Sequence, residues 1–280
     1  MKSSFRTAAS CLAQADLPES EAMLLLGHVL QRNSAWLHAF SEADIEPADF
    51  DKFAALVRRR RAGEPIAYLT GEKEFWSLPL SVSQPVLIPR PETELLVDLA
   101  LQLMPSDSDQ SLLDLGTGSG AIALAIASER PQAKIIAVDS CADALAIARD
   151  NANRLDLTQI QFLRSHWYRE IGDMRFDLIV SNPPYISEGD KHLADLRFEP
   201  VGALVADNDG LSDLQTIVAE CRTHLAPNGW LLVEHGYQQQ AAVVQLFEEN
   251  DLNNIRTYRD LSGNPRVVCG CHNVSTSEIV

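Results

Sequence analysis

The chain has 280 residues, of which 46% are hydrophobic and 22% are charged. This composition is that of a globular protein and excludes a largely disordered chain. No apolar run approaches the roughly 20 residues that a membrane-spanning helix needs. Residues 1–16 lack the apolar core of a signal peptide, so we expect a cytoplasmic protein without a membrane partner.

The charge is negative and unevenly distributed. The chain carries 23 basic and 39 acidic residues, a net charge of −16. Residues 1–80 hold 9 basic and 11 acidic residues, a net −2, which leaves −14 for residues 81–280. A strongly negative region repels a phosphate backbone, so we expect no direct binding of nucleic acid by the larger part.

The five cysteines and seven histidines show no metal-binding spacing. The sequence has no C-x-x-C and no H-E-x-x-H, and its cysteine count is odd, so we expect neither a disulfide framework nor a metal site. Cys269 and Cys271 alternate with their neighbours in a predicted strand, which is typical of ordinary packing.

Residues 1–70 are predicted to form a small helical bundle. One helix opens at Pro18 with acids in its first turn, and a second starts at Pro47 and ends in the basic run Arg58–Arg61. Residues 71–90 contain glycine, three prolines and short β-type runs at 74–76, 80–82 and 86–88, which indicate a β-hairpin linker.

Residues 91–280 alternate between predicted strands and helices, after a first helix over 91–104. This order predicts an α/β fold with a Rossmann-like, doubly wound and mainly parallel sheet. The last two strands are too close for a helical crossover, so they should be antiparallel. The predicted strands are 112–115, 134–139, 160–163, 176–181, 229–234, 255–258 and 266–270, and the predicted helices are 121–129, 142–155, 212–225 and 238–249.

A glycine-rich loop follows the first predicted strand of this region. It reads Asp114-Leu-Gly116-Thr117-Gly118-Ser119-Gly120. Glycines let the backbone approach a ligand, and the following helix offers free N–H groups. Asp139 ends the next strand, where a carboxylate can bind ribose hydroxyls. The pattern favours a nucleoside cofactor over a turn without a ligand, and it also fits a dinucleotide.

A second motif, Asn182-Pro183-Pro184-Tyr185, follows the strand that should lie beside the first. A proline-stiffened turn would explain it without a ligand. Next to the glycine loop, however, the Asn182 side-chain carbonyl and the Pro183 backbone carbonyl could accept both hydrogens of one –NH₂ group. Tyr185 offers a flat face for a planar amide or base.

Together the two motifs resemble the S-adenosylmethionine-dependent methyltransferases that act on planar nitrogens. Residues 71–94, Arg197–Pro200 and Glu234–Gly236 are similar to the release factor glutamine N5-methyltransferases, and the resemblance covers nearly the whole chain. It implies methyl transfer to the glutamine N5 in the GGQ motif of class-1 peptide chain release factors, with S-adenosylhomocysteine as product. It also implies domains at 1–70 for substrate recognition, 71–90 as the linker and 91–280 for catalysis.

The resemblance also implies roles for single residues. Gly116, Thr117, Gly118, Ser119 and Gly120 would surround the methionine part of the cofactor. Asp139 would hold the ribose and Trp167 would lie along the adenine, although His166 stands where the family often has Asp. Asn182, Pro183, Pro184 and Tyr185 would bind the glutamine, with Asn182 also contacting the cofactor. Phe75 would either form a wall of the pocket around the glutamine amide or pack between the domains.

Several alternatives stay open at the level of sequence. A ribosomal-protein glutamine methyltransferase and a nucleic acid base methyltransferase share the Asn-Pro-Pro-Tyr motif. An inactive binding protein is disfavoured because the glycines, Asp139 and Asn182 are intact. Arg58–Arg61 either complements its helix dipole or docks an acidic partner. We expect a monomer.

Overall fold

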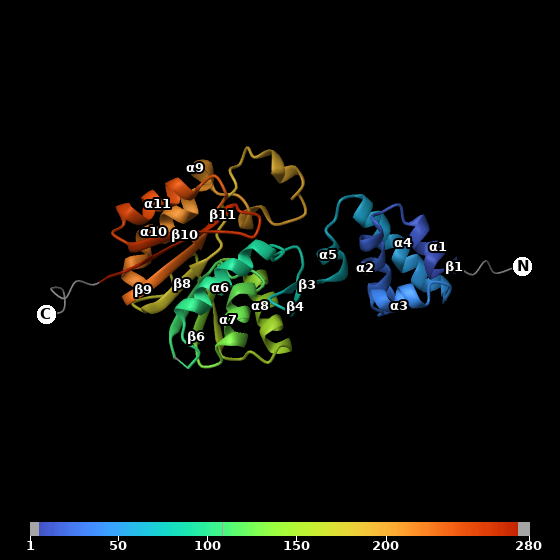
Figure 1. Cartoon of the computed structure of the whole chain (residues 1–280), viewed down its shortest axis with the longest axis horizontal. Coiled ribbons are helices and arrows are strands. Elements are labelled where there is room, and N and C mark those ends of the chain that lie inside the picture. Colours follow the sequence, from blue (N-terminus) through green and yellow to red (C-terminus); the bar gives the residue numbers. More distant parts are fainter. Residues whose placement is uncertain (1–5, 108, 274–280) are drawn as a thin grey trace, which may run out of the picture. The chain divides into compact units, whose positions relative to one another are not determined.

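The computed structural model describes residues 6–107 and 109–273. The chain divides into two compact units, Met1–Glu72 and Lys73–Val280. Figure 1 traces the chain from its N-terminal helices to its C-terminal strands. The two units are described separately, because each has hydrophobic clusters drawn from its own residues.

The first unit is a helical bundle, as the sequence predicts. Its core contains Leu25, Leu26, Leu37 and Phe53, and Thr7 caps the first helix by accepting a hydrogen bond from the Ser10 N–H. A pair of two-residue antiparallel strands, β1 and β2, was not predicted. The elements are β1 Arg6–Thr7, α1 Ala8–Gln14, α2 Glu19–Leu30, α3 Ser34–Ala39, β2 Asp44–Ile45, α4 Pro47–Arg61 and α5 Ile66–Thr70.

Three arginines of the basic run at the end of α4 bind other residues of the same unit. Arg59 bonds Glu64 at 2.5 Å, and Arg60 bonds Glu21 at 2.6 Å. Arg61 donates to the Ala15 carbonyl oxygen at 2.8 Å. Ion pairs and helix-end contacts therefore account for three of the four arginines, which favours the intramolecular interpretation of the run over partner docking.

The linker forms a hairpin of β3 Glu72–Phe75 and β4 Leu78–Ser81. Its two turn residues, Trp76 and Ser77, have φ values of 52° and 59°, as a type I′ turn requires. The predicted third run at 86–88 is not a strand. Prolines stand on both sides of it, and the Ile88 N–H donates to a Glu199 carboxylate oxygen at 3.1 Å instead of to a sheet partner.

The second unit contains one seven-stranded sheet in the order β10-β11-β9-β8-β5-β6-β7. All neighbouring pairs are parallel except the two that involve β11. The mainly parallel sheet and its antiparallel last hairpin confirm the predicted topology. The strands are β5 Ser111–Leu115, β6 Lys134–Asp139, β7 Ile160–Arg164, β8 Phe176–Ser181, β9 Leu225–Glu234, β10 Asn253–Arg259 and β11 Pro265–Cys271.

The helices between these strands agree with the predicted ones to within a few residues. Two short 3₁₀ turns and a one-turn helix between β8 and α10 were not predicted. The helical elements are η1 Pro91–Thr93, α6 Glu94–Leu103, α7 Ala121–Glu129, α8 Ala142–Arg154, η2 Lys191–Ala194, η3 Val201–Ala203, α9 Asp207–Gly210, α10 Ser212–His224 and α11 Gln240–Glu249.

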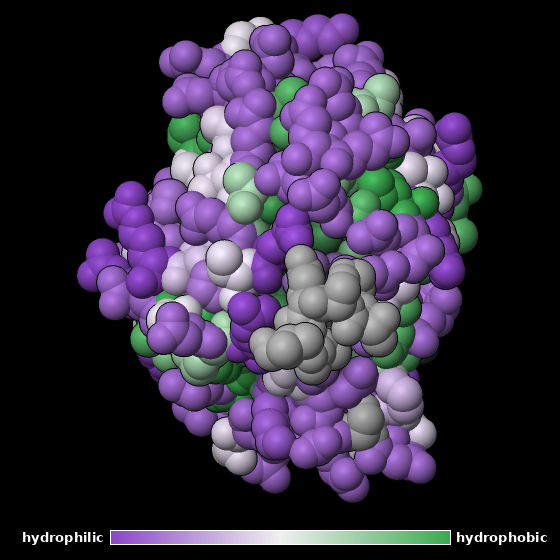
Figure 2. Space-filling model, turned by 90° about the vertical axis from the view of Figure 1, so that its left-hand side faces the viewer, coloured by the Kyte–Doolittle hydropathy of each residue, from purple (hydrophilic) through white to green (hydrophobic). Residues whose placement is uncertain are grey.

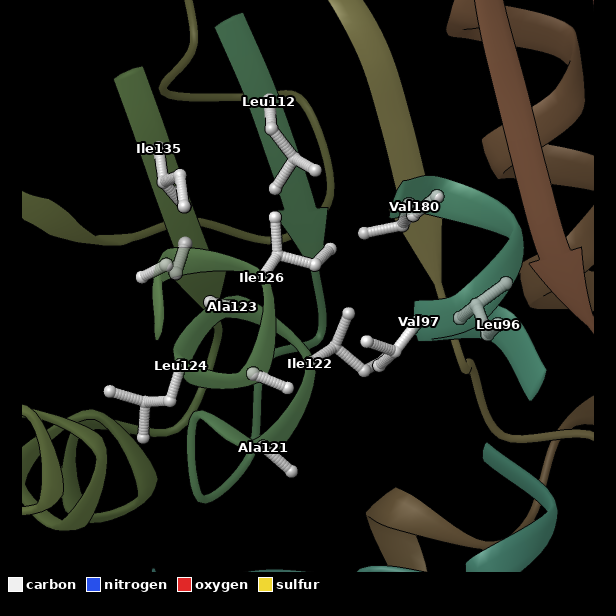
Figure 3. Close-up of a cluster of buried hydrophobic side chains, with 14 of the residues drawn as sticks. Leu96, Val97, Leu112, Ala121, Ile122, Ala123, Leu124, Ile126, Ile135 and Val180 are labelled. Carbon is white, nitrogen blue, oxygen red and sulfur yellow. The ribbon is translucent and has the colours of Figure 1, made fainter. Parts of the chain in front are cut away.

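Both faces of the sheet are buried. On β5, Leu112 belongs to one hydrophobic cluster and Leu113 to the other, because side chains alternate along a strand. Figure 3 shows α7 over the first face, with Ile126 toward Leu112 and Ile122 toward Val97 of α6. Helices α10 and α11 supply the cluster on the second face. Because side chains on both faces of the sheet are buried, the strands have defined positions, and so do the ends of the loops that follow them.

On the face that Figure 2 shows, polar side chains cover most of the surface. Figure 2 shows one face of the molecule, with small hydrophobic areas between hydrophilic ones. Within the described residues, no helix combines the length and the apolar character needed to cross a membrane.

Candidate active site

A pocket of about 380 Å³ opens at the carboxyl ends of the parallel strands in the second unit. In an open α/β sheet, ligands bind at this edge, where the strand order reverses on either side of the first strand. The pocket is lined by residues that follow four neighbouring strands: Gly116 and Gly118 after β5, Asp139 at the end of β6, Trp167 after β7, and Asn182 after β8.

The glycine loop takes conformations that require glycine. Gly116, Gly118 and Gly120 have φ values of 75°, 56° and 87°. A Cβ atom on Gly116 would lie 3.3 Å from the Trp167 ring, whereas one on Gly118 would project into open space. Gly120 stands directly before α7 and accepts the Leu124 N–H. The loop therefore leaves its surface at Gly118 free for a ligand.

Asp139 links the glycine loop to the start of α8. One carboxylate oxygen accepts the Gly118 N–H at 2.9 Å, and the other accepts the Cys141 N–H at 2.8 Å. Burial raises the pKa of Asp139, and these backbone donors partly counter the effect. Each oxygen has a second lone pair, so Asp139 can hold the loop and still accept hydrogen bonds from a ligand.

Trp167 forms one wall of the pocket in a left-handed conformation, with φ 49°. Its indole N–H donates to an Asp213 carboxylate oxygen at 3.3 Å, and His166 packs edge-on against its ring. Burial raises the pKa of Asp213. Asp213 was missed by sequence analysis, because an acid in the first turn of a helix is commonplace and gives no separate signal.

The Asn182 side chain has a defined orientation. Its Nδ2 donates to the Thr93 hydroxyl oxygen at 3.0 Å, and Asn182 and Pro184 both line the pocket. One of the two amide hydrogens is thereby engaged, and the side-chain carbonyl can accept a hydrogen bond from a ligand. Thr93 lies within the Arg-Pro-Glu-Thr-Glu stretch that carries the family resemblance, but nothing in its sequence context assigned it a role.

Tyr185 lies behind the pocket and is not among the residues that line it. Its hydroxyl donates to a Glu234 carboxylate oxygen at 3.2 Å. Burial and the nearby Glu234 charge raise the pKa of Tyr185 above its ordinary value. Its backbone carbonyl accepts the Gln239 side-chain N–H at 2.9 Å, which ties the turn after β8 to the loop after β9.

Four other predicted site residues are buried and do not line the pocket. Thr117 donates to a buried Asp114 oxygen at 2.6 Å, and Ser119 is buried. Pro183, like both of these, does not line the pocket. Phe75 is 1% exposed and packs in the hydrophobic cluster of the second unit. Its position fits a packing role and does not support Phe75 as a wall of the pocket.

Gly210 packs closely against the turn that contains Tyr185. We therefore expect its replacement to lower the stability of the protein. Gly210 has φ 80°, and an added Cβ would lie 2.1 Å from the Tyr185 carbonyl oxygen. Gly210→Ala should lower the free energy of unfolding by about 2–3 kcal/mol, through backbone strain and displacement of Tyr185. Thermal unfolding measures the change. Gly189→Ala is the matched control, since nothing lies within 4 Å of its Cβ position; equal stability of the two variants would contradict this expectation.

Two family models match the chain. "Methyltransferase small domain" matches residues 93–197, and "PrmC N-terminal domain" matches residues 4–71. Among solved structures, a methyltransferase from Pyrococcus furiosus has a TM-score of 0.55 at 16% identity, covering 79% of this chain and 98% of that one. A ribosomal protein L11 methylase from Lactobacillus delbrueckii has a TM-score of 0.52 at 19% identity, covering 69% and 84%.

The sheet order, the glycine loop and these matches define a class I, S-adenosylmethionine-dependent methyltransferase. Curated relatives are more specific. A release factor glutamine methyltransferase from Salmonella typhimurium is 47% identical over 92% of this chain and 94% of the relative. One from Escherichia coli is 47% identical over 95% and 96%. The chain belongs to the release factor glutamine methyltransferase family.

Proposed function

We propose that this enzyme transfers a methyl group from S-adenosylmethionine to the side-chain amide nitrogen of glutamine in the GGQ motif of class-1 peptide chain release factors. The observation that carries the proposal is the orientation of Asn182, whose amide nitrogen is bound to Thr93 at 3.0 Å so that its carbonyl is left for an –NH₂ group. The names of the relatives support the same substrate.

The pocket residues fit the cofactor. Gly118 leaves room for it along the loop, Asp139 has free lone pairs for ribose hydroxyls, and Trp167 offers a flat wall for the adenine. When bound, S-adenosylmethionine supplies an electrophilic methyl carbon on a sulfonium sulfur. Gly116 and Gly120 set the path of the loop, and the buried Thr117 and Ser119 hold it in place.

An amide nitrogen is a weak nucleophile, so the protein must orient it. The Asn182 side-chain carbonyl and the Pro183 backbone carbonyl would accept its two hydrogens, and Pro184, with Tyr185 behind it, would bound its plane. These acceptors aim the nitrogen and stabilise the positive charge that develops on it during transfer. Alignment of this kind can account for roughly 7–11 kcal/mol of the barrier. The proton leaves to water, and no general base is assigned.

The helical unit would recognise the release factor away from the glutamine. It has its own core and contains none of the residues that line the pocket. In this proposal the protein acts as a monomer in the cytoplasm. The net charge of −14 over residues 81–280 weighs against a nucleic acid base as the substrate.

One experiment separates the candidate substrates. The protein is incubated with methyl-labelled S-adenosylmethionine and, in parallel, with release factor, ribosomal protein, tRNA or DNA. We expect label in the release factor alone, on the glutamine of its GGQ peptide. Label confined to ribosomal protein or to nucleic acid would refute the proposed substrate.

Cofactor affinity tests the role of Asp139. Asp139→Ala should weaken S-adenosylmethionine binding by about 1–3 kcal/mol, roughly 5- to 150-fold in Kd, because the ribose loses its acceptor and Gly118 its partner. Calorimetric titration measures the affinity. Asp143→Ala, an exposed carboxylate of the next helix that does not line the pocket, is the control. Wild-type affinity in Asp139→Ala would remove the ribose role.

A further inference from the structure

The Gln239 side chain lies where three loops meet. Its Oε1 accepts the Gly236 N–H at 2.8 Å. Its Nε2 donates to the Tyr185 carbonyl oxygen at 2.9 Å and to the Asp209 carbonyl oxygen at 3.1 Å. An amide nitrogen has two hydrogens, and these contacts use both of them. One neutral side chain therefore joins the turn after β8, the segment before α10 and the turn after β9.

Two glycines make room for this amide. A Cβ atom on Gly236 would lie 2.9 Å from the Gln239 Oε1. One on Gly210 would lie 2.8 Å from the Gln239 Nε2 and 2.1 Å from the Tyr185 carbonyl oxygen. A side chain at either position would therefore displace the amide. Gly236 belongs to the Glu234–Gly236 stretch that carries part of the family resemblance, and its closeness to Gln239 is a physical reason for a glycine there.

The one-turn element α9, directly before α10, has a left-handed backbone. Asn208 and Asp209 have φ values of 54° and 56°, and Gly210 follows with 80°. Asparagine and aspartate enter this region mainly as single residues, so a run of three persists only where its surroundings hold it. Gln239 binds the Asp209 carbonyl, and the Asn208 Nδ2 donates to the Gln215 Oε1 at 3.1 Å. These contacts fix the segment at the start of α10.

Resting on the proposed function, we propose that Gln239 is a positioning residue for methyl transfer, which holds the turn Asn182–Tyr185 against the start of α10. Gln239 is not among the residues that line the pocket, so it would act through the backbone carbonyl of Tyr185. The Asp209 carbonyl is the anchor on the other side, and both carbonyls share one amide nitrogen. Loss of that nitrogen releases the turn from its anchor.

The start of α10 is also part of the pocket. Asp213, four residues after Asp209, lines the pocket and accepts the Trp167 indole N–H at 3.3 Å. Gln239 therefore connects the turn that would bind the glutamine to the element that holds the wall proposed for the adenine. Methyl transfer needs the reacting atoms aligned at about 3–3.5 Å. A small shift between the two sides should lower the rate of transfer more than the affinity for either ligand.

The first test compares Gln239→Glu with Gln238→Glu in single-turnover methylation of a GGQ peptide. Glutamate keeps the shape and the acceptor for the Gly236 N–H, but it sets a carboxylate oxygen against two carbonyl oxygens. The rate should fall roughly 10- to 100-fold, with the Kd values of S-adenosylmethionine and peptide within about threefold of wild type. Gln238→Glu makes the same charge change at an exposed neighbouring position and should keep the wild-type rate.

Two results of this comparison would overturn the proposal. One is a wild-type rate in Gln239→Glu, because the turn would then be positioned without the amide nitrogen. The other is a loss of cofactor affinity as large as the loss of rate, because the amide would then support the whole pocket and not the alignment of the glutamine.

A second pair of variants separates positioning from stability. Gln239→Met keeps the length of the side chain, adds no charge and removes all three hydrogen bonds. Val243→Ala opens a cavity in the hydrophobic cluster beside α11 and lies outside the pocket. Both should lower the melting temperature. At a temperature well below both transitions, Gln239→Met should be at least about tenfold slower than wild type, and Val243→Ala should keep its rate. Equal rates in the two variants would reduce Gln239 to a structural residue and overturn the proposal.

The proposed function and the positioning role fail in different ways. If the wild-type protein leaves the GGQ peptide and whole release factor unlabelled, the proposed function is refuted before any variant is made. If the wild-type protein labels them and the Gln239 variants do so at the same rate, the function stands and the positioning role is wrong.

Discussion

Replacing Asn182 by alanine should lower the single-turnover rate of methyl transfer by about 10²–10³-fold, the typical effect of losing one electrostatic contact to a transition state. The alanine removes the side-chain carbonyl that would accept a hydrogen of the substrate amide, and with it the amide nitrogen that donates to Thr93. Pro183 and Pro184 keep the turn, so thermal stability should change little. The contact strengthens as charge grows on nitrogen, so the loss falls on the rate more than on KM.

Asn182→Asp is the sharper comparison, and it should be partly active. It keeps an acceptor in the same place, but its second oxygen meets the Thr93 oxygen, which already acts as an acceptor. Thr93 would then have to donate its hydrogen to this oxygen instead of accepting from Asn182, and the added charge can bind a proton or attract the sulfonium. Rapid-quench measurement on a GGQ peptide ranks the three proteins. Near wild-type rates for Asn182→Ala would show that Pro183 and Tyr185 suffice to orient the glutamine amide, and the role proposed for Asn182 would be wrong.

The fold was predictable because its signals are local. Helix α7 and strands β6 and β8 were predicted with the bounds that the structure has, since each is a strongly apolar segment ended by glycine, proline or polar residues. The prediction of a strand at 86–88 was wrong for a physical reason. Its apolar residues suit a strand, but flanking prolines and a bond to Glu199, more than 100 residues away, decide its conformation.

The candidate site could be located from the sequence only where a residue type is tied to a backbone position. The glycine loop, Asp139 and Asn182 follow strand ends and can be located by counting along the chain. Thr93 and Glu234 cannot, because their roles depend on contacts between segments 89 and 49 residues apart, Thr93 with Asn182 and Glu234 with Tyr185. Phe75 illustrates the reverse case, in which an apolar residue near a motif turns out to be core packing.

Deleting residues 1–70 should separate recognition of the release factor from catalysis. The deletion removes α1 to α5 with the whole of their hydrophobic cluster and leaves β3 and the second unit intact. Both clusters of the second unit are built from residue 75 onward, so that unit retains its core and its pocket. We expect kcat/KM on whole release factor to fall by about 10²-fold, equivalent to a docking interaction of roughly 3 kcal/mol.

A short GGQ peptide is the control substrate, because it is too small to reach a second binding surface. The truncated and full-length proteins should methylate this peptide at similar rates and bind S-adenosylmethionine with similar Kd. The difference between whole factor and peptide therefore measures recognition alone, since the chemistry is common to both. If the truncated protein modified whole release factor as fast as the full chain, the binding energy would come from the methyltransferase unit, and the helical unit would serve another purpose.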